Sequence, residues 1–187
     1  QHTEKPVLRT APAPMFLLSK LVRESQFKVV MTGEGADEVF GGYDLFKETK
    51  IRRFWSRQPD SKIRPLLLKR LYPYMKNLQA QSPDYLKAFF KIREDELDSP
   101  FFSHLPRWDL TAKLKTFFSD DLKQELQAQD PQAEFQQQLP ARFSEWPSFC
   151  QAQYLEAINL MPGYILSSQG DRMAMGNSVE GRFPFLD

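Results

Sequence analysis

One segment of the chain, residues 26–32, has the pattern of a buried β-strand, whereas the rest has the patterns of helices. Gln26-Phe-Lys-Val-Val-Met-Thr32 is short, rich in β-branched residues and followed by two glycines. We therefore predict a buried strand over Phe27 to Met31 that ends in a tight loop, and no other convincing strand. Such a chain is expected to be mainly helical, with one core strand of a parallel α/β sheet whose other strands lie upstream.

Apolar residues at helical spacing predict helices on both sides of this strand. Before it, Met15, Leu18 and Val22 follow Pro14, which is acceptable at the start of a helix. After Gly42 the predicted helices lie at 45–55, on both sides of a break at Pro73, from Pro83 with Ser82 as N-cap, from the N-cap Ser119 to about 129, and over 149–166 with an interruption at Pro162-Gly163. Residues 124–139 are rich in glutamine and contain Pro131, which predicts a surface connection. We predict two parts, the end of the sheet with its loop in residues 1–43 and a helical part in residues 44–187.

Composition excludes several classes of protein. Apolar residues make up 41% of the 187 residues, enough for a core, and Lys+Arg total 25 against Asp+Glu 24, so no nucleic acid or membrane partner is expected. Residues 47–76 are mostly basic, and Glu94, Asp95, Glu96 and Asp98 form an acidic cluster. We interpret both as solvated helix faces.

A single cysteine, Cys150, allows no internal disulfide and favours a reducing compartment, here the cytoplasm. Cys150 is expected to lie in the core. No signal peptide or membrane-spanning apolar run is present in the sequence. The chain starts without an initiator Met and stops after Phe183-Pro-Phe-Leu-Asp187, so we expect both ends to be truncations.

The loop after the predicted strand has the properties of a phosphate site. Gly33 and Gly35 allow close approach of a phosphate to the backbone, and the N–H groups of the following helix point toward that position. The dinucleotide fingerprint does not fit, because Glu38 stands where its third glycine belongs, and no Gly-Lys-Ser/Thr follows for a P-loop.

Three acidic residues distinguish this loop. Glu34, Asp37 and Glu38 lie within five positions, and bare carboxylates would repel a phosphate. The arrangement makes sense if one carboxylate holds Mg²⁺ and another meets a cationic or proton-donating substrate. The alternative is that these acids only favour the helix N-terminus electrostatically.

Two segments carry a resemblance to a known family. Gly33-Glu-Gly-Ala-Asp-Glu-Val-Phe-Gly-Gly-Tyr43 resembles the pyrophosphate-loop region of asparagine synthetases. The final segment, Asp171 to Asp187, resembles a second signature of that family. The two segments bracket most of the chain, and their order and separation agree with the family.

The resemblance implies an adenine-nucleotide alpha hydrolase-like α/β domain. It implies an enzyme of asparagine biosynthesis that uses ATP and Mg²⁺ to convert aspartate to β-aspartyl-AMP, then aminates it with ammonia from glutamine. By motif position, Thr32 and Gly33 would contact the adenylate, Gly35 would lend its backbone to the pyrophosphate, Glu34 would be catalytic and Asp37 would bind the metal. The resemblance leaves open the roles of Glu38, Tyr43, Asp171, Arg172, Glu180 and Arg182.

Parts of the family pattern are absent from this sequence. The Ser-Gly-Gly-Xaa-Asp-Ser loop and the N-terminal cysteine of the glutaminase domain are not found, so we expect this chain alone to be inactive. The parent enzyme could form a homodimer. Two other functions stay open: an adenylating amidotransferase that acts on another acid, and a non-catalytic helical interaction domain. Met173 and Met175 are expected to pack in the interior.

Overall fold

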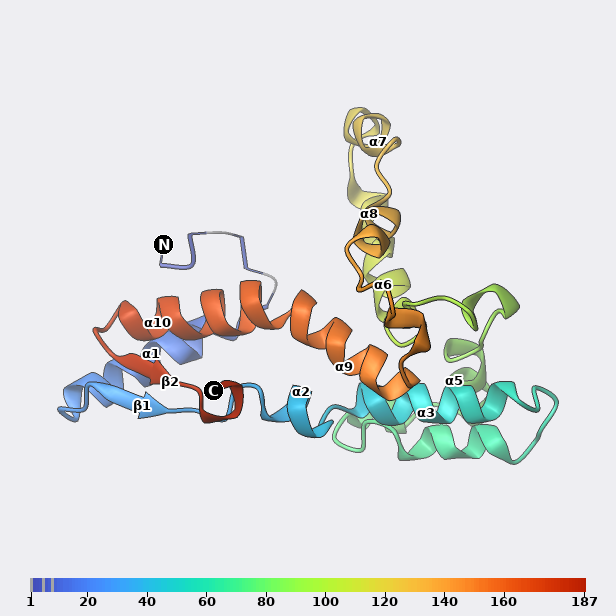
Figure 1. Cartoon of the computed structure of the whole chain (residues 1–187), viewed down its shortest axis with the longest axis horizontal. Helices are drawn as coiled ribbons and strands as arrows, with labels where there is room; N and C mark the ends of the chain where they lie inside the picture. Colours follow the sequence, from blue (N-terminus) through green and yellow to red (C-terminus); the bar gives the residue numbers. More distant parts are fainter. Residues whose placement is uncertain (1, 5, 8) are drawn as a thin grey trace. The chain divides into compact units, whose positions relative to one another are not determined.

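The computed structural model describes residues 2–4, 6–7 and 9–187, which divide into two compact units (Figure 1). The first unit joins Gln1–Tyr43 to Gln153–Asp187, and the second is Asp44–Ala152. This division differs from the predicted parts 1–43 and 44–187, because the last segment supplies a strand and helices to the first unit.

The first unit contains a parallel pair of strands, β1 (Val29–Met31) and β2 (Glu180–Arg182), with Val30 opposite Gly181. Its helices are α1 (Pro12–Glu24), α2 (Ala36–Phe40), the end of α9 (Ser148–Asn159), the π-helix η5 (Met161–Asp171), α10 (Arg172–Met175) and the 3-10 helix η6 (Pro184–Leu186). Helix α1 packs against α10 and η5. The Ser19 hydroxyl ties α1 to α10, because it donates to the Met173 carbonyl at 2.8 Å.

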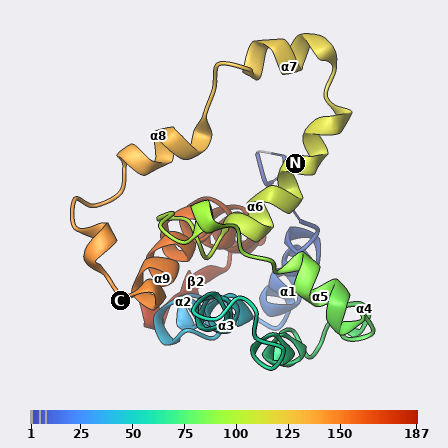
Figure 2. The ribbon, with the colours of Figure 1, turned by 90° about the vertical axis from the view of Figure 1, so that its right-hand side faces the viewer.

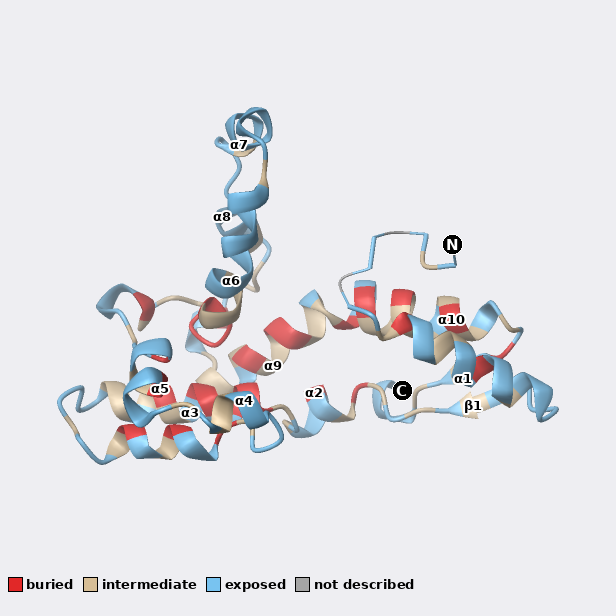
Figure 3. Cartoon of the chain, turned by 180° about the vertical axis from the view of Figure 1, so that it is seen from behind, coloured by how far each residue is buried: buried red, intermediate tan, exposed pale blue. Residues whose placement is uncertain are grey.

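The sheet differs from the prediction in three respects. β1 begins at Val29 instead of Phe27, and Val29 and Met31 are 46% and 73% exposed, so the prediction of a buried strand is wrong (Figure 3). A strand is buried only where other elements cover its faces, and the described sheet has two strands. The sequence does not predict β2, because Glu180, Gly181 and Arg182 lack apolar alternation.

The second unit is helical, as predicted for the chain after Gly42. Its elements are α3 (Asp44–Ser56), η1 (Arg64–Arg70), α4 (Lys76–Gln79), α5 (Pro83–Phe89), η2 (Glu94–Glu96), α6 (Leu105–Ala112), η3 (Lys113–Phe117), α7 (Asp120–Leu126), α8 (Pro131–Gln137), η4 (Phe143–Glu145) and the start of α9. Two predicted N-caps are confirmed. The hydroxyl of Ser82 accepts from the Tyr85 N–H at 3.1 Å, and that of Ser119 from the Leu122 N–H at 3.3 Å.

An apolar cluster holds α3, η1 and α5 together. Leu68, Leu71, Leu86 and Phe90 are buried, and Ile51, Trp55, Tyr72 and Leu78 pack against them. The helices α7 and α8, in contrast, lie in a largely exposed connecting segment between α6 and η4 (Figure 2). The prediction of a glutamine-rich surface connection there is confirmed.

A buried ion pair corrects the interpretation of the charged segments. Arg52 is 1% exposed and donates to Glu96 Oε2 at 2.9 Å and to the Phe102 carbonyl at 2.9 Å. These two residues therefore do not lie on solvated faces, because each neutralises the other in the interior.

Helix α9 brings a further correction. Cys150 is exposed on it, so the prediction of a core cysteine is wrong, whereas Ala152 and Leu155 are fully buried. The predicted interruption at Pro162-Gly163 is present as a change to the π-helix η5. Among the described residues, no helix is both long and apolar enough to cross a membrane.

Candidate functional site

The loop between β1 and α2 turns sharply at Gly35. The Thr32 N–H donates to the Arg182 carbonyl at 2.9 Å, which continues the sheet ladder to the edge of the loop. Gly35 then precedes α2 with a φ of 90°, and a Cβ there would lie 2.3 Å from Leu186 Cδ2. A glycine is needed at position 35 for its backbone conformation and for space.

The start of this loop offers polar groups to a ligand. The Thr32 hydroxyl is buried and has no hydrogen-bond partner among the described residues. At Gly33 a Cβ would meet no atom within 4 Å, so there is open space beside this backbone. The carboxyl end of a parallel strand is where α/β sheets bind ligands. Thr32 and Gly33 therefore lie where a nucleotide can approach the backbone, whereas Gly35 is buried against Leu186.

Two carboxylates of the loop remain available for chemistry. Burial raises the pKa of Glu34, and the nearby carboxylates of Glu38 and Asp37 raise it further. Asp37 is exposed, and its carboxylate lies so close to Gly42 that a Cβ at Gly42 would be 1.9 Å from Asp37 Oδ1. Glu34 is thus a carboxylate of raised basicity, and Gly42 leaves room for Asp37.

Glu38 is structural, because its groups are used within the unit. It is 4% exposed, and its Oε1 accepts from the Tyr43 hydroxyl at 2.8 Å. Burial and the hydrogen bond to Glu38 raise the pKa of Tyr43. The Gln153 amide donates to the carbonyls of Glu38 at 2.8 Å and Val39 at 3.0 Å, which fixes the end of α2. No sequence signal identifies Gln153, since it lies 115 residues from Glu38.

The donor set near Asp37 suits Mg²⁺ bound together with phosphates. Among the described residues, no group of three or more His, Cys, Asp and Glu side chains is arranged to hold a metal by itself. Mg²⁺ commonly takes one or two carboxylates and completes its shell with water and substrate phosphates. The exposed Asp37 carboxylate, with Glu34 nearby, fits that mode.

The second signature contributes mainly structure. Arg182 pairs with Glu180 at 2.7 Å on the strand that supports β1. Arg172 contacts the Thr3 carbonyl and lies 3.4 Å from the Glu4 carboxylate, whereas Asp171 is exposed. The interior position of Met173 is confirmed, but Met175 is 61% exposed, which corrects the packing prediction for it.

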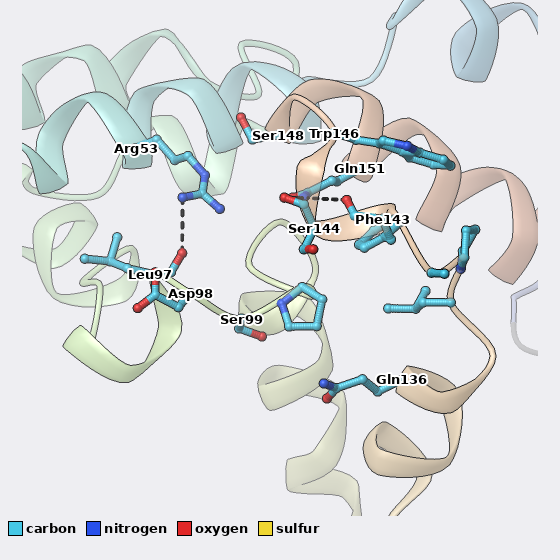
Figure 4. A pocket seen from close by; sticks show the side chains of 14 residues that line it. Arg53, Leu97, Asp98, Ser99, Gln136, Phe143, Ser144, Trp146, Ser148 and Gln151 are labelled. Carbon is cyan, nitrogen blue, oxygen red and sulfur yellow. Dashed lines mark hydrogen bonds between the residues drawn. The ribbon is translucent and has the colours of Figure 1, made fainter.

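One cavity lies in the second unit, and its wall contains none of these residues. It measures about 730 Å³, and its wall includes Arg53, Asp98, Ser144, Trp146 and Ser148 (Figure 4). The Arg53 guanidinium donates to the Leu97 carbonyl at 3.1 Å, and Gln151 donates to the Phe143 carbonyl at 3.0 Å. Asp98 is the one carboxylate on this wall. This cavity therefore lacks a group of acidic side chains like that of the β1–α2 loop.

Comparisons with known proteins identify the family of this chain. The model of the family described as Asparagine synthase matches residues 1–187. An asparagine synthetase [glutamine-hydrolyzing] 1 of Bacillus subtilis (strain 168) is 28% identical over 189 residues, covering 100% of this chain and 27% of the relative. A nodule asparagine synthetase [glutamine-hydrolyzing] of Pisum sativum is 36% identical over 101 residues, covering 50% of this chain and 17% of the relative.

A relative with a different name is similar over the same length. The amidase chyE of Penicillium rubens is 28% identical over 195 residues, covering 100% of this chain and 28% of the relative. The chain thus spans about a quarter of the length of the relatives that it matches throughout. No solved structure matches the chain significantly.

Proposed function

Because the chain belongs to the asparagine synthase family, we propose that it is part of the synthetase domain of an ATP-dependent asparagine synthetase. The proposed enzyme activates the side-chain carboxylate of aspartate with ATP and aminates it with ammonia released from glutamine. Aspartate, ATP and glutamine are proposed for the whole protein, since this chain spans about 27% of a relative with that name.

The proposed roles follow the loop from the strand outward. The free Thr32 hydroxyl and the open backbone of Gly33 bind the adenylate. The proposed role of Gly35, to lend its backbone to the pyrophosphate, rests on the family resemblance of the loop. Asp37 would hold Mg²⁺, which would neutralise phosphate charge. Glu34 accepts a proton from the attacking ammonia, a role to which its raised pKa is suited.

The observation that supports this proposal most is the left-handed turn at Gly35. It separates Glu34 from Asp37 and places both acids next to a strand end with an unused hydroxyl. A loop with a solely structural role would need neither a buried, unpaired hydroxyl nor a carboxylate whose pKa is raised.

The test is aspartate-dependent exchange of labelled pyrophosphate into ATP by the full-length protein. We expect exchange that requires Mg²⁺ and aspartate, and asparagine formation when glutamine or ammonia is added. Exchange with another acid but not with aspartate would refute the proposed acceptor while keeping the adenylation chemistry. If a folded, full-length protein gave no exchange with any acid, the proposed function would be wrong.

A further inference from the structure

Helix α2, which follows the loop, has few apolar contacts to stabilise it. It is five residues long, and an isolated helix of that length is not stable in water. Its buried residue is Glu38, whereas Val39 is 49% and Phe40 72% exposed. Burial of apolar surface therefore contributes little to α2, and the helix depends on the hydrogen bonds made at its ends.

A glycine turn provides part of these hydrogen bonds. The last carbonyls of a helix have no partner within it. At the end of α2 the chain turns at Gly41, with a φ of 72°, and the N–H groups of Gly41 and Gly42 both donate to the Asp37 carbonyl. The turn thus leaves the next carbonyls of α2 to be paired from elsewhere.

Gln153 supplies the missing donors. Its side-chain amide nitrogen donates to the Glu38 carbonyl at 2.8 Å and to the Val39 carbonyl at 3.0 Å, from 115 and 114 positions away. Both partners lie in the first unit. A primary amide carries two N–H groups on one nitrogen, so a single glutamine can serve two successive carbonyls.

The position of Asp37 follows from the backbone of α2. Asp37 is exposed, and no ion pair or hydrogen bond within the described residues holds its carboxylate. The side chain of Glu38, in contrast, is held by the Tyr43 hydroxyl at 2.8 Å. What keeps the end of α2 in place therefore also determines where Asp37 presents its carboxylate.

We propose that Gln153 is a positioning residue for the reaction, which acts by holding the carboxyl end of α2 and thereby the carboxylate of Asp37. Gln153 itself touches neither substrate nor metal in this role. The catalytic part of the inference rests on the proposed function, in which Asp37 binds Mg²⁺ together with the phosphates of ATP. The support of α2 by Gln153 rests only on the two hydrogen bonds.

Gln151 offers a matched control on the same helix. Its amide also donates to two successive carbonyls, those of Phe143 at 3.0 Å and Ser144 at 3.5 Å. These carbonyls belong to the second unit and lie far along the chain from the β1–α2 loop. Replacement of either glutamine by methionine removes the same kind of hydrogen bond, but only the change at Gln153 should affect α2.

The first measurement needs no activity. Backbone hydrogen exchange is followed by NMR in the full, ¹⁵N-labelled 187-residue chain and in its variants. In Gln153→Met we expect the amides of Gly41 and Gly42 to exchange about tenfold faster or more, because the end of α2 opens more often. In Gln151→Met these two amides should exchange as in the unmodified chain.

A second variant keeps this test decisive if Gln153→Met does not fold. Gln153→Glu has the same shape but replaces the amide nitrogen by an oxygen, so it also removes both donors. Unchanged exchange at Gly41 and Gly42 in either folded variant would overturn the proposal. The same acceleration in Gln151→Met would also overturn it, because the effect would then not be specific to α2.

The second measurement is pyrophosphate exchange by the full-length protein at increasing magnesium concentration. In Gln153→Met the magnesium concentration for half-maximal exchange should rise about threefold to tenfold, since Asp37 is held less well. The rate at saturating magnesium should stay close to that of the unmodified protein. Gln151→Met should change neither quantity, whereas a solely structural role of Gln153 would lower the amount of active protein and leave its magnesium dependence unchanged.

The two measurements separate this inference from the proposed function. If hydrogen exchange at Gly41 and Gly42 accelerates in Gln153→Met but the magnesium dependence is unchanged, the positioning role is refuted and the proposed function stands. If the unmodified full-length protein gives no pyrophosphate exchange with any acid, the proposed function is wrong, and the catalytic part of this inference is refuted with it. The support of α2 by Gln153 would then still be decided by hydrogen exchange.

Discussion

Glu34 and Glu38 have the same side chain, four positions apart, in different environments. Glu38 is buried and accepts from the Tyr43 hydroxyl, so its carboxylate is committed to holding the loop. Glu34 has no such partner, and its pKa is raised by burial and by the neighbouring acids. Only Glu34 therefore combines basicity with an available carboxylate, and we expect substitutions of the two residues to fail in different ways.

Glu34→Gln should reduce catalysis while leaving the fold intact. The substitution keeps the size but removes the basicity, so a general-base role predicts a fall of roughly 10²–10⁴ in the rate of ammonia-dependent asparagine synthesis. The rate is measured in the full-length protein, with circular dichroism to confirm folding. Glu24→Gln, at the exposed end of α1, is the matched control. Full activity in a folded Glu34→Gln protein would remove Glu34 from the mechanism.

Asp37→Asn should instead change the magnesium and pH dependence. A neutral amide is a poorer partner for Mg²⁺, so a higher magnesium concentration should restore part of the rate. Asp37 also helps to raise the pKa of Glu34, so without its charge that pKa falls. Because Glu34 must be ionised to accept a proton, the acid limb of the kcat/KM profile should move to lower pH.

The same assays in Glu34→Gln provide the contrast for Asp37→Asn. That variant should lack the acid limb due to Glu34 and show the usual magnesium requirement. Identical magnesium titrations for the two variants would argue that Asp37 has no separate role in metal binding.

At the scale of elements, the short helix α2 depends on the glycine before it. Gly35→Ala should destabilise the fold by about 1–2 kcal/mol, because it forces a Cβ into a left-handed conformation and against Leu186. Gly33→Ala is the matched control, since its Cβ would meet nothing within 4 Å. Urea denaturation measures both. Equal stability of the two variants would show that the turn at Gly35 is not under this constraint.

Local sequence patterns predict the helices and their caps, but they do not predict pairings between residues far apart in the chain. The N-caps Ser82 and Ser119 are predictable because a cap is made with a residue three positions away. Strand β2 is defined by pairing with β1, across most of the chain, and its own residues give no strand pattern. The hydrogen bond from the Gln153 amide to the Glu38 carbonyl also joins residues far apart in the chain, so no local pattern predicts it. The loop acids were therefore predictable, whereas the residue that fixes their helix was not.

At the scale of the whole molecule, the second unit keeps several charges in its interior. Arg52 pairs with Glu96 across 44 positions, and Glu48 lies beside Arg107 and Tyr72. Buried charges cost desolvation, and an acid for which that cost exceeds what its partners return is favoured in its neutral form. The stability of this unit is therefore expected to depend on the protonation of its buried acid.

Glu48 supplies the test of that dependence. Burial raises its pKa above the ordinary value of 4.5, although Arg107, Tyr72 and Arg52 oppose the shift. As the pH rises above about 4.5, the unfolded chain loses this proton before the folded chain does. The contribution of Glu48 to stability is thus fully present below the unfolded pKa and is lost as the pH rises through the folded pKa.

Glu48→Gln has no such proton, so the stability of the unmodified chain relative to this variant should be greatest in acid and decline as the pH rises. Urea denaturation of both proteins between about pH 4 and pH 8 gives the difference in free energy of unfolding at each pH. The exposed Glu125→Gln is measured alongside as the control for a charge change without burial. A difference between the chain and Glu48→Gln that stayed constant, or grew with pH, would mean that burial does not govern the protonation of Glu48, because desolvation acts only in the folded state.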